Sequence, residues 1–162
     1  MEWGFKWCFF SMKSAYMTLC NSSNGVSHDV FSLLWQVKAI PKVVFTTWRV
    51  LLGRLPTYDN LSRRGMVVNC SLCVLCKATE ESSQHIFLSC IIAQRVWSLC
   101  LRWIGILSIQ HKDLINHFES FHLVNLSIKQ NLVWKRLWVA IIRSIWDKRN
   151  LVVFKQGIAD AE

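Results

Sequence analysis

The stretch CSLCVLCKATEESSQHIFLSC, residues 70–90, places four cysteines and one histidine within one short segment. Counted from Cys73, the spacing is C-x2-C-x8-H-x4-C. A CxxC turn brings two thiolates to one ion, and three thiolates with one imidazole complete the tetrahedral shell of a structural zinc site. Such a shell leaves no open position for a substrate. One candidate ligand set for Zn2+ is therefore Cys73, Cys76, His85 and Cys90.

Spacing alone leaves the ligand set open. Cys70-x2-Cys73 is also a CxxC pair. A second alternative is that all four cysteines are buried thiols, because free cysteine behaves as a small hydrophobic residue. Glu80 and Glu81 lie in the loop that connects the cysteines to the histidine. We expect them to be solvated, with a role as hydrogen-bond acceptors near the metal as the alternative.

The composition indicates a folded protein rather than a disordered one. The chain has 162 residues, of which 52% are hydrophobic, and nine are tryptophans. Its most apolar windows are interrupted by Lys and Arg, so we expect no membrane span. The first residues, MEWGFKWCFFSMKSAY, do not form a signal peptide. Seven cysteines, an odd number, favour metal binding or buried thiols over disulfides. We therefore expect an intracellular location, with the nucleus as one option.

The charge balance favours a polyanionic partner. Nineteen Lys and Arg residues stand against ten acidic residues, which gives a net charge of +9. Such an excess suits nucleic acid, either RNA or DNA. The alternative is that these residues are the solvated faces of amphipathic helices. The candidate contacts are Lys42, Arg49, Arg54, Arg63, Arg64, Lys135, Arg136, Arg143, Lys148 and Arg149.

Periodicity predicts a mostly α fold with a small zinc-tied Cys/His centre and a few short strands. The strands are expected near the start of the chain and around the cysteines. Pro41 suits the first turn of a helix, and Gly65 and Gly105 suit helix ends. In the third predicted helix we expect Ile92, Val96, Leu99 and Trp103 to share one side. Helices are predicted over residues 41–52, 58–64, 91–104 and 129–154.

Three parts follow from this pattern. Residues 1–105 are predicted to form the domain that carries the metal motif of residues 73–90. Residues 106–128 are mixed and weakly patterned, and we interpret them as a connecting segment. We expect its three histidines, His111, His117 and His122, to be ordinary surface or partly buried residues. Residues 129–155 are predicted to form a Trp-rich basic C-terminal helix.

Motifs across nearly the whole chain resemble one known family. The chain is similar to the zinc-binding domain that follows the reverse transcriptase in plant non-LTR (LINE-type) retrotransposons. FSMKSAY resembles the usual entry to that domain, and IPKVVFTTWRVLLGRLPTYDNLSRRG resembles its most recognisable segment. CVLC, EES, H-x-F and the last cysteine resemble its metal motif, and AQRVW resembles the segment that follows. The C-terminal pattern W-x-x-RN-x-x-x-F corresponds to Trp146, Arg149, Asn150 and Phe154.

The resemblance implies a ligand set and a context. It selects Cys73, Cys76, His85 and Cys90 and leaves Cys70 outside. It implies Zn2+ as the cofactor and a parent element that holds RNA and target DNA. Thr46 and Thr47 depart from the family, which usually has a more aromatic or apolar pair there. The chain carries no YxDD-like polymerase motif and no spaced acids for two-metal chemistry, so we do not expect an enzyme or a small-molecule substrate.

Three functions compete at this point. The first is a zinc-stabilised, non-catalytic module that binds nucleic acid. The second is a structural or protein-interaction module, in which the tryptophans pack on a reverse transcriptase domain or another partner. The third is a transposon-derived relic without a selected function.

Overall fold

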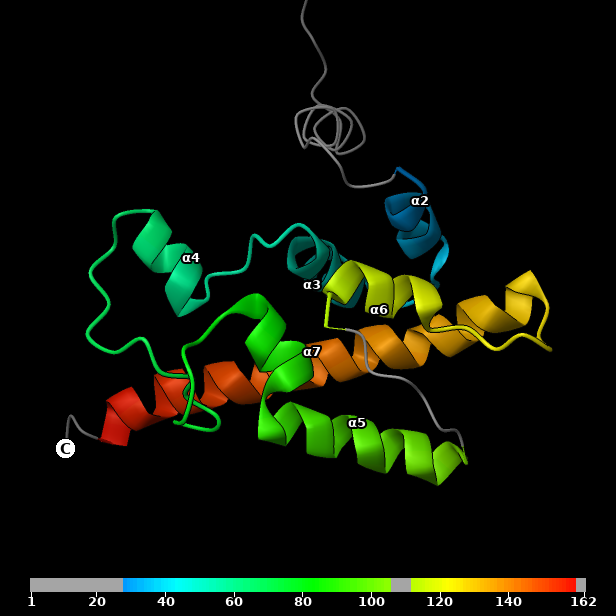
Figure 1. Ribbon diagram of the computed structural model, residues 1–162. Coiled ribbons are helices and arrows are strands. Elements are labelled where there is room, and N and C mark those ends of the chain that lie inside the picture. Colours follow the sequence, from blue (N-terminus) through cyan, green and yellow to red (C-terminus); the bar gives the residue numbers. More distant parts are fainter. Residues whose placement is uncertain (1–27, 106–111, 160–162) are drawn as a thin grey trace, which may run out of the picture.

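A computed structural model describes residues 28–105 and 112–159, and it confirms the mostly α fold around a Cys/His cluster (Figure 1). In these residues, β structure is limited to one antiparallel bridge between Leu72 and Glu80. The strand predicted near the start lies outside the described residues. The helical elements are α2 (His28–Gln36), α3 (Pro41–Leu51), α4 (Tyr58–Arg63), a π-helical turn η1 (His85–Ser89), α5 (Ile91–Ile104), α6 (Leu114–Ser120) and α7 (Ile128–Ala159).

Helix α7 is the axis of the structure. Its 32 residues give a length of about 48 Å, at 1.5 Å per residue. Helices α3 and α5 and the turn η1 pack against it, and α2 and α6 pack against α3 (Figure 1). The predicted C-terminal helix therefore shares one core with the segment that carries the metal motif. None of the described helices combines the length and the apolar character that crossing a membrane requires.

The helix ends follow the local sequence signals. Pro41 opens α3, where its missing N–H is not needed. Gly65 and Gly105 follow α4 and α5 with φ angles of 77° and 79°, in the left-handed region that favours glycine. Thr57 stands at the N-cap of α4, but its hydroxyl bonds the Asp59 carboxylate instead of a backbone amide.

The side of α5 that Ile92, Val96, Leu99 and Trp103 share is not the buried side of the helix. Ala93, Trp97 and Leu101 are buried, whereas Leu99 and Trp103 are 55% and 86% exposed. Ile92 and Val96 are half-buried, so the side that the four residues share extends from the edge of the core to solvent. The indole of Trp97 decides the face, because its Nε1 donates to the buried Phe87 carbonyl at 2.8 Å.

Helix α6 lies within residues 106–128, for which the sequence predicts only a connecting segment. The Asp113 side chain accepts a hydrogen bond from the Asn116 amide at 2.9 Å, which caps the helix. Leu114, His117 and Phe118 are buried. His117 accepts a hydrogen bond at Nδ1 from the Trp138 indole at 2.7 Å, so this histidine is a core residue.

Candidate metal centre

The CxxC pair lies in a tight turn that the backbone closes on itself. The Cys73 amide donates to the Thr79 carbonyl at 2.8 Å, and the Lys77 amide donates to the Cys73 carbonyl at 2.7 Å. Lys77 has a φ of 55°, which lets the chain reverse direction. The bridge between Leu72 and Glu80 closes the base of the turn. Both thiols are thereby directed to the same side.

The second half of the motif forms a single π-helical turn. The Cys90 amide donates to the His85 carbonyl at 2.7 Å, which is the i to i+5 hydrogen bond of that turn. The H-x4-C spacing therefore equals the number of residues that one π-turn closes. The Ser82 hydroxyl accepts from the His85 amide at 3.1 Å and fixes the start of the turn.

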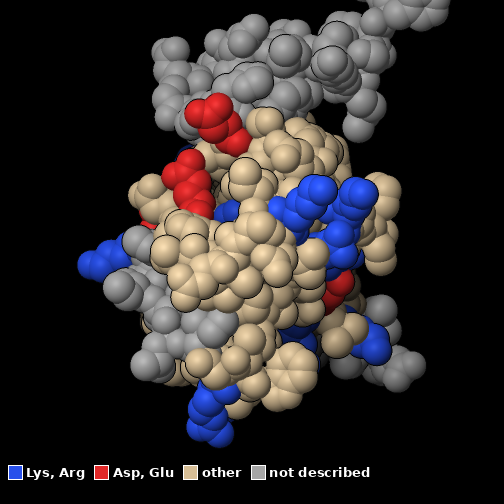
Figure 2. Space-filling view, turned by 90° about the vertical axis from the view of Figure 1, so that its right-hand side faces the viewer, with Lys and Arg blue, Asp and Glu red and all other residues tan. Residues whose placement is uncertain are grey.

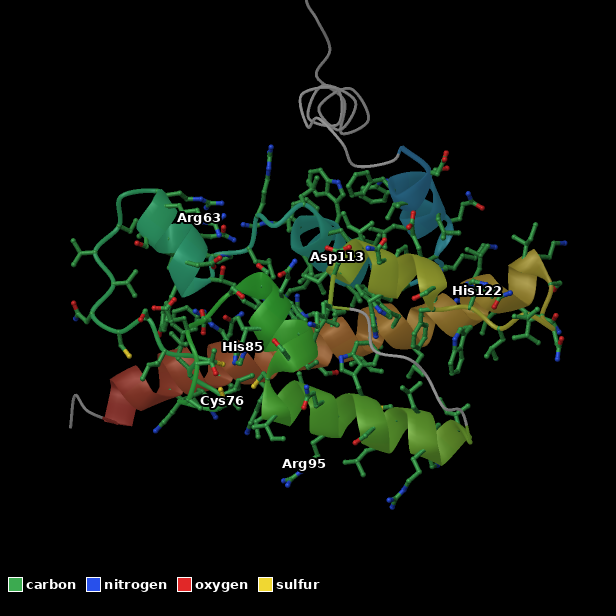
Figure 3. All side chains as sticks on the ribbon, in the orientation of Figure 1. Arg63, Cys76, His85, Arg95, Asp113 and His122 are labelled. Carbon is green, nitrogen blue, oxygen red and sulfur yellow. The ribbon has the colours of Figure 1, made fainter. Side chains whose placement is uncertain are left out.

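The four candidate ligands meet at one point. Their ligand atoms, three Sγ and one imidazole nitrogen, all lie within 4.8 Å of one another. Cys76 Sγ lies 3.2 Å from His85 Nε2, and the other ring nitrogen, Nδ1, lies 3.5 Å from the Ser89 hydroxyl. Figure 3 shows Cys76 and His85 side by side near α7. Ligands at 2.0–2.3 Å from a tetrahedral ion are separated by roughly 3.3–3.8 Å, so the cluster fits such an ion.

The electrostatics of the cluster also suit a cation. Burial acts to raise the pKa of the Cys76 thiol, but hydrogen bonds from the Ala78 amide and the His85 ring outweigh it and lower this pKa to about 6. Burial raises the pKa of the Cys73 thiol to about 12. A bound cation reverses this second effect, because a coordinating thiol is deprotonated. The site therefore gains charge balance when it holds a metal ion.

Cys70 lies outside the cluster. It is exposed, whereas Cys73 and Cys90 are fully buried. The backbone between residues 70 and 73 is extended and includes the bridge residue Leu72, so this stretch does not form a CxxC turn. The structure thus brings together the set that starts at Cys73.

Glu81 links the metal centre to the rest of the fold, contrary to the expectation of a solvated side chain. It is 1% exposed, while its neighbour Glu80 is exposed. Its carboxylate accepts a hydrogen bond from the Tyr58 amide at 3.0 Å. Glu81 thereby supplies the cap at the start of α4 that the Thr57 hydroxyl does not supply. Its other partner is Arg149 of α7, at 2.6 Å and 3.3 Å.

Arg149 is therefore not a free basic residue, which corrects its place among the predicted nucleic-acid contacts. It is 3% exposed, and its guanidinium lies over the rings of Tyr58 and Trp146. A buried pair of this kind is favourable only with good geometry and further hydrogen bonds. The two bonds to Glu81 and the bond from Tyr58 supply them.

Lys135 is the second correction. It is 3% exposed, and its Nζ donates to the carbonyls of Phe118 and Glu119 at the end of α6. Burial lowers the pKa of Lys135 to about 8, against a partial opposing effect of the Glu119 carboxylate. The ammonium therefore caps the end of α6 and is buried.

The other predicted basic contacts lie at the surface. Arg63 pairs with Asp59 at 2.9 Å, and half-buried Arg143 pairs with Asp147 at 2.7 Å and donates to Thr46 at 2.9 Å. On the side of the molecule shown in Figure 2, basic side chains stand in separate groups on a mostly uncharged surface. Half-buried Arg49 and the exposed residues Lys42, Arg54, Arg64, Arg136 and Lys148 complete the set.

A comparison with protein families matches residues 10–97 to the family described as zinc-binding in reverse transcriptase. The chain belongs to this family. The match covers more than half of the chain, contains all four clustered ligand residues and confirms the predicted family. The narrower assignment to plant non-LTR elements stays a prediction. Comparisons with curated proteins and with solved structures found no match.

Proposed function

We propose that this chain is a non-catalytic, zinc-stabilised module that binds nucleic acid. The observation that carries the proposal is a group of three arginines. Arg49 of α3 and Arg64 after α4 both donate to the carbonyl oxygen of Arg54, at 3.1 Å and 3.5 Å. We call Arg49, Arg54 and Arg64 the arginine cluster.

The arginine cluster has the composition of a phosphate contact. Within the described residues, none of its members takes part in an ion pair, whereas the adjacent Arg63 is paired with Asp59. The shared Arg54 carbonyl brings the guanidinium groups of Arg49 and Arg64 close together, and like charges at close range are unfavourable by themselves. A phosphate group reverses this cost, because guanidinium groups form charge-assisted, often bidentate hydrogen bonds with it.

The zinc site supplies the framework for this surface. Three thiolates and one imidazole form a closed shell that is typical of structural Zn2+ and leaves no position for catalysis. We call the turn that carries the CxxC pair, together with Glu81 at its end (residues 72–81), the metal turn. Its residue Glu81 caps α4 by accepting a hydrogen bond from the Tyr58 amide. Helix α4 leads directly into Arg64. We therefore expect the ion to stabilise the fold that presents the cluster.

A salt titration tests the proposal. We expect the purified protein to carry one zinc by native mass spectrometry and to bind RNA or DNA oligonucleotides with an affinity that falls steeply with salt. The double variant Arg49→Gln/Arg64→Gln should reduce the log–log salt slope by roughly 1.4 on a single strand, at about 0.7 per phosphate contact. A wild-type slope near zero would overturn the proposal.

A matched control separates the cluster from net charge. Lys38→Gln/Lys112→Gln removes two charges from exposed positions outside the arginine cluster. This variant should keep the wild-type slope within about 0.5. Equal losses in both double variants would mean that total charge, rather than the cluster, binds the polyanion.

The family description favours a second candidate, packing on a reverse transcriptase domain. In this case the module would bind a protein, and the exposed loop side chains Met66 and Val67 are available for such a contact. Co-purification of the chain with a reverse transcriptase domain, lost in Val67→Asp, would support it. Binding that resists high salt would separate this function from the first.

A further inference from the structure

Helix α5 presents an unusual surface to solvent. Three large apolar side chains are exposed on it: Ile91 at 59%, Leu99 at 55% and Trp103 at 86%. Arg95 and Arg102 are exposed on the same side, and Figure 3 shows Arg95 pointing away from the body of the molecule. We call these five residues the α5 outer face.

The α5 outer face is not a consequence of core packing. The opposite side of the helix carries Trp97 and fills the core. Arg95, Leu99 and Trp103 follow one another at i, i+4 and i+8, so they form a row about 12 Å long. A tryptophan that is almost fully exposed beside two cations is a typical stacking platform for bases.

Charge decides the class of ligand. Helix α5 contains no acidic residue. Within residues 28–105 and 112–159, neither the Arg95 nor the Arg102 guanidinium has a hydrogen bond or an ion pair. An apolar protein surface would have to bury both charges without partners, which is costly. A polyanion with exposed aromatic rings satisfies the arginines and the tryptophan together.

We propose that the α5 outer face binds single-stranded nucleic acid. Arg95 and Arg102 contact phosphates, and Trp103 stacks on an unpaired base. The bases of a duplex are already stacked on each other and offer no free face, so the site selects single strands. The inference rests on the proposed function and adds a site that lies apart from the arginine cluster, with Arg102 and Trp103 beyond the family match of residues 10–97.

Fluorescence anisotropy with a labelled 12-nucleotide single strand and the duplex of the same sequence tests the site. Trp103→Ala should weaken single-strand binding roughly 5- to 150-fold and leave duplex binding within about twofold. Trp103→Phe should recover most of the loss, because a phenyl ring still stacks. Phe154→Ala, which removes another exposed aromatic ring on α7, should leave both affinities unchanged.

The outcomes distinguish this site from the proposed function. Single-strand binding that Trp103→Ala does not weaken removes the α5 assignment but leaves the salt-dependent function intact. Equal losses for single strand and duplex overturn the stacking role. No binding of either oligonucleotide by the zinc-loaded wild type overturns both. Sedimentation that shows a wild-type dimer abolished by Trp103→Ala, with unchanged oligonucleotide affinity, assigns the face to a second copy instead.

Discussion

The two ends of α7 are held by different kinds of contact. Its C-terminal half is anchored by the buried Arg149, which pairs with Glu81 of the metal turn. Its N-terminal half is anchored by Trp138, which packs against Trp97 and donates to His117. The first anchor joins an ion pair to the candidate metal centre, and the second consists of aromatic rings. We call them the metal end and the aromatic end.

The difference between the two ends indicates which half of α7 depends on a bound ion for its stability. At the metal end, removing either partner of the Glu81–Arg149 pair leaves a charge buried without compensation. The proposed ion adds to this dependence, because metal binding is coupled to folding. At the aromatic end, the energy comes from burial of ring surface, which needs no ion. Loss of zinc should therefore destabilise the structure around Arg149 and the C-terminal half of α7 before it destabilises the structure around Trp138.

The largest effect is expected from loss of the metal. Cys76→Ser and His85→Ala should abolish stoichiometric zinc binding and lower the free energy of unfolding by several kcal/mol, because metal binding is coupled to folding. Hydrogen exchange should rise first in residues 73–90 and around Arg149. Native mass spectrometry and exchange at residue resolution measure both effects.

Cys70→Ser is the control for that prediction. Because Cys70 is exposed and outside the cluster, its loss should leave zinc occupancy unchanged and stability within about 0.5 kcal/mol. Equal damage from Cys70→Ser would contradict the ligand set. Uniform loss of exchange protection over the whole chain would contradict the distinction between the two ends of α7.

The buried ion pair gives the next largest effect. Arg149→Met leaves the Glu81 carboxylate buried without its cation and should cost about 3–5 kcal/mol. The double variant Glu81→Gln/Arg149→Met should cost less, because a neutral amide still accepts from Tyr58. Chemical denaturation of the zinc-loaded proteins completes the double-mutant cycle. A double variant as unstable as the sum of its singles would show that the pair is not coupled.

Much of this architecture was accessible from the sequence, because the signals were local. Pro41, Gly65 and Gly105 mark helix boundaries through their own backbone preferences. The spacing of Cys73, Cys76, His85 and Cys90 reflects one turn and one π-turn, although spacing alone did not exclude Cys70. The family pattern was needed to choose between the two sets.

The errors share another cause, which is that tertiary contacts decide the role of a charge. Lys135 and Arg149 were predicted as nucleic-acid contacts because they are basic. Both are in register with the buried stripe Trp138, Ile142 and Ile145, at spacings of three and four. That register was the available signal for burial. Their partners come from α6 and from the metal turn, which no local pattern of α7 reveals.

At the aromatic end, Trp138→Phe should have a moderate effect. It removes the indole donor to His117 and leaves a small cavity, which together should cost about 2 kcal/mol. Zinc affinity should stay nearly unchanged, because the ring partners of Trp138, namely Trp97, His117 and Phe118, are not among the candidate ligands. Thermal denaturation with a parallel zinc titration measures this separation. A shift in zinc affinity as large as that of Arg149→Met would mean that the two ends are coupled through α7.

The smallest effect is a pH dependence at Lys135. Its pKa is about 8 in the folded protein and near 10.5 when unfolded, so the unfolded chain binds more protons between these values. Stability should therefore rise with pH from 8 to 10.5 by on the order of 1–2 kcal/mol, as the penalty for burying the ammonium is relieved. Lys135→Met lacks this group. The unfolding free energy of the wild type minus that of the variant should therefore increase as pH rises.

That difference also removes the titration of cysteines and tyrosines, which both proteins share. Lys148→Met, at an exposed position on the same helix, should give a difference that is flat with pH. A flat difference for Lys135→Met as well would mean that the ammonium is solvated and that α6 ends without this cap. A difference that falls with pH would mean that the carbonyls of Phe118 and Glu119 stabilise the charged form more than burial opposes it.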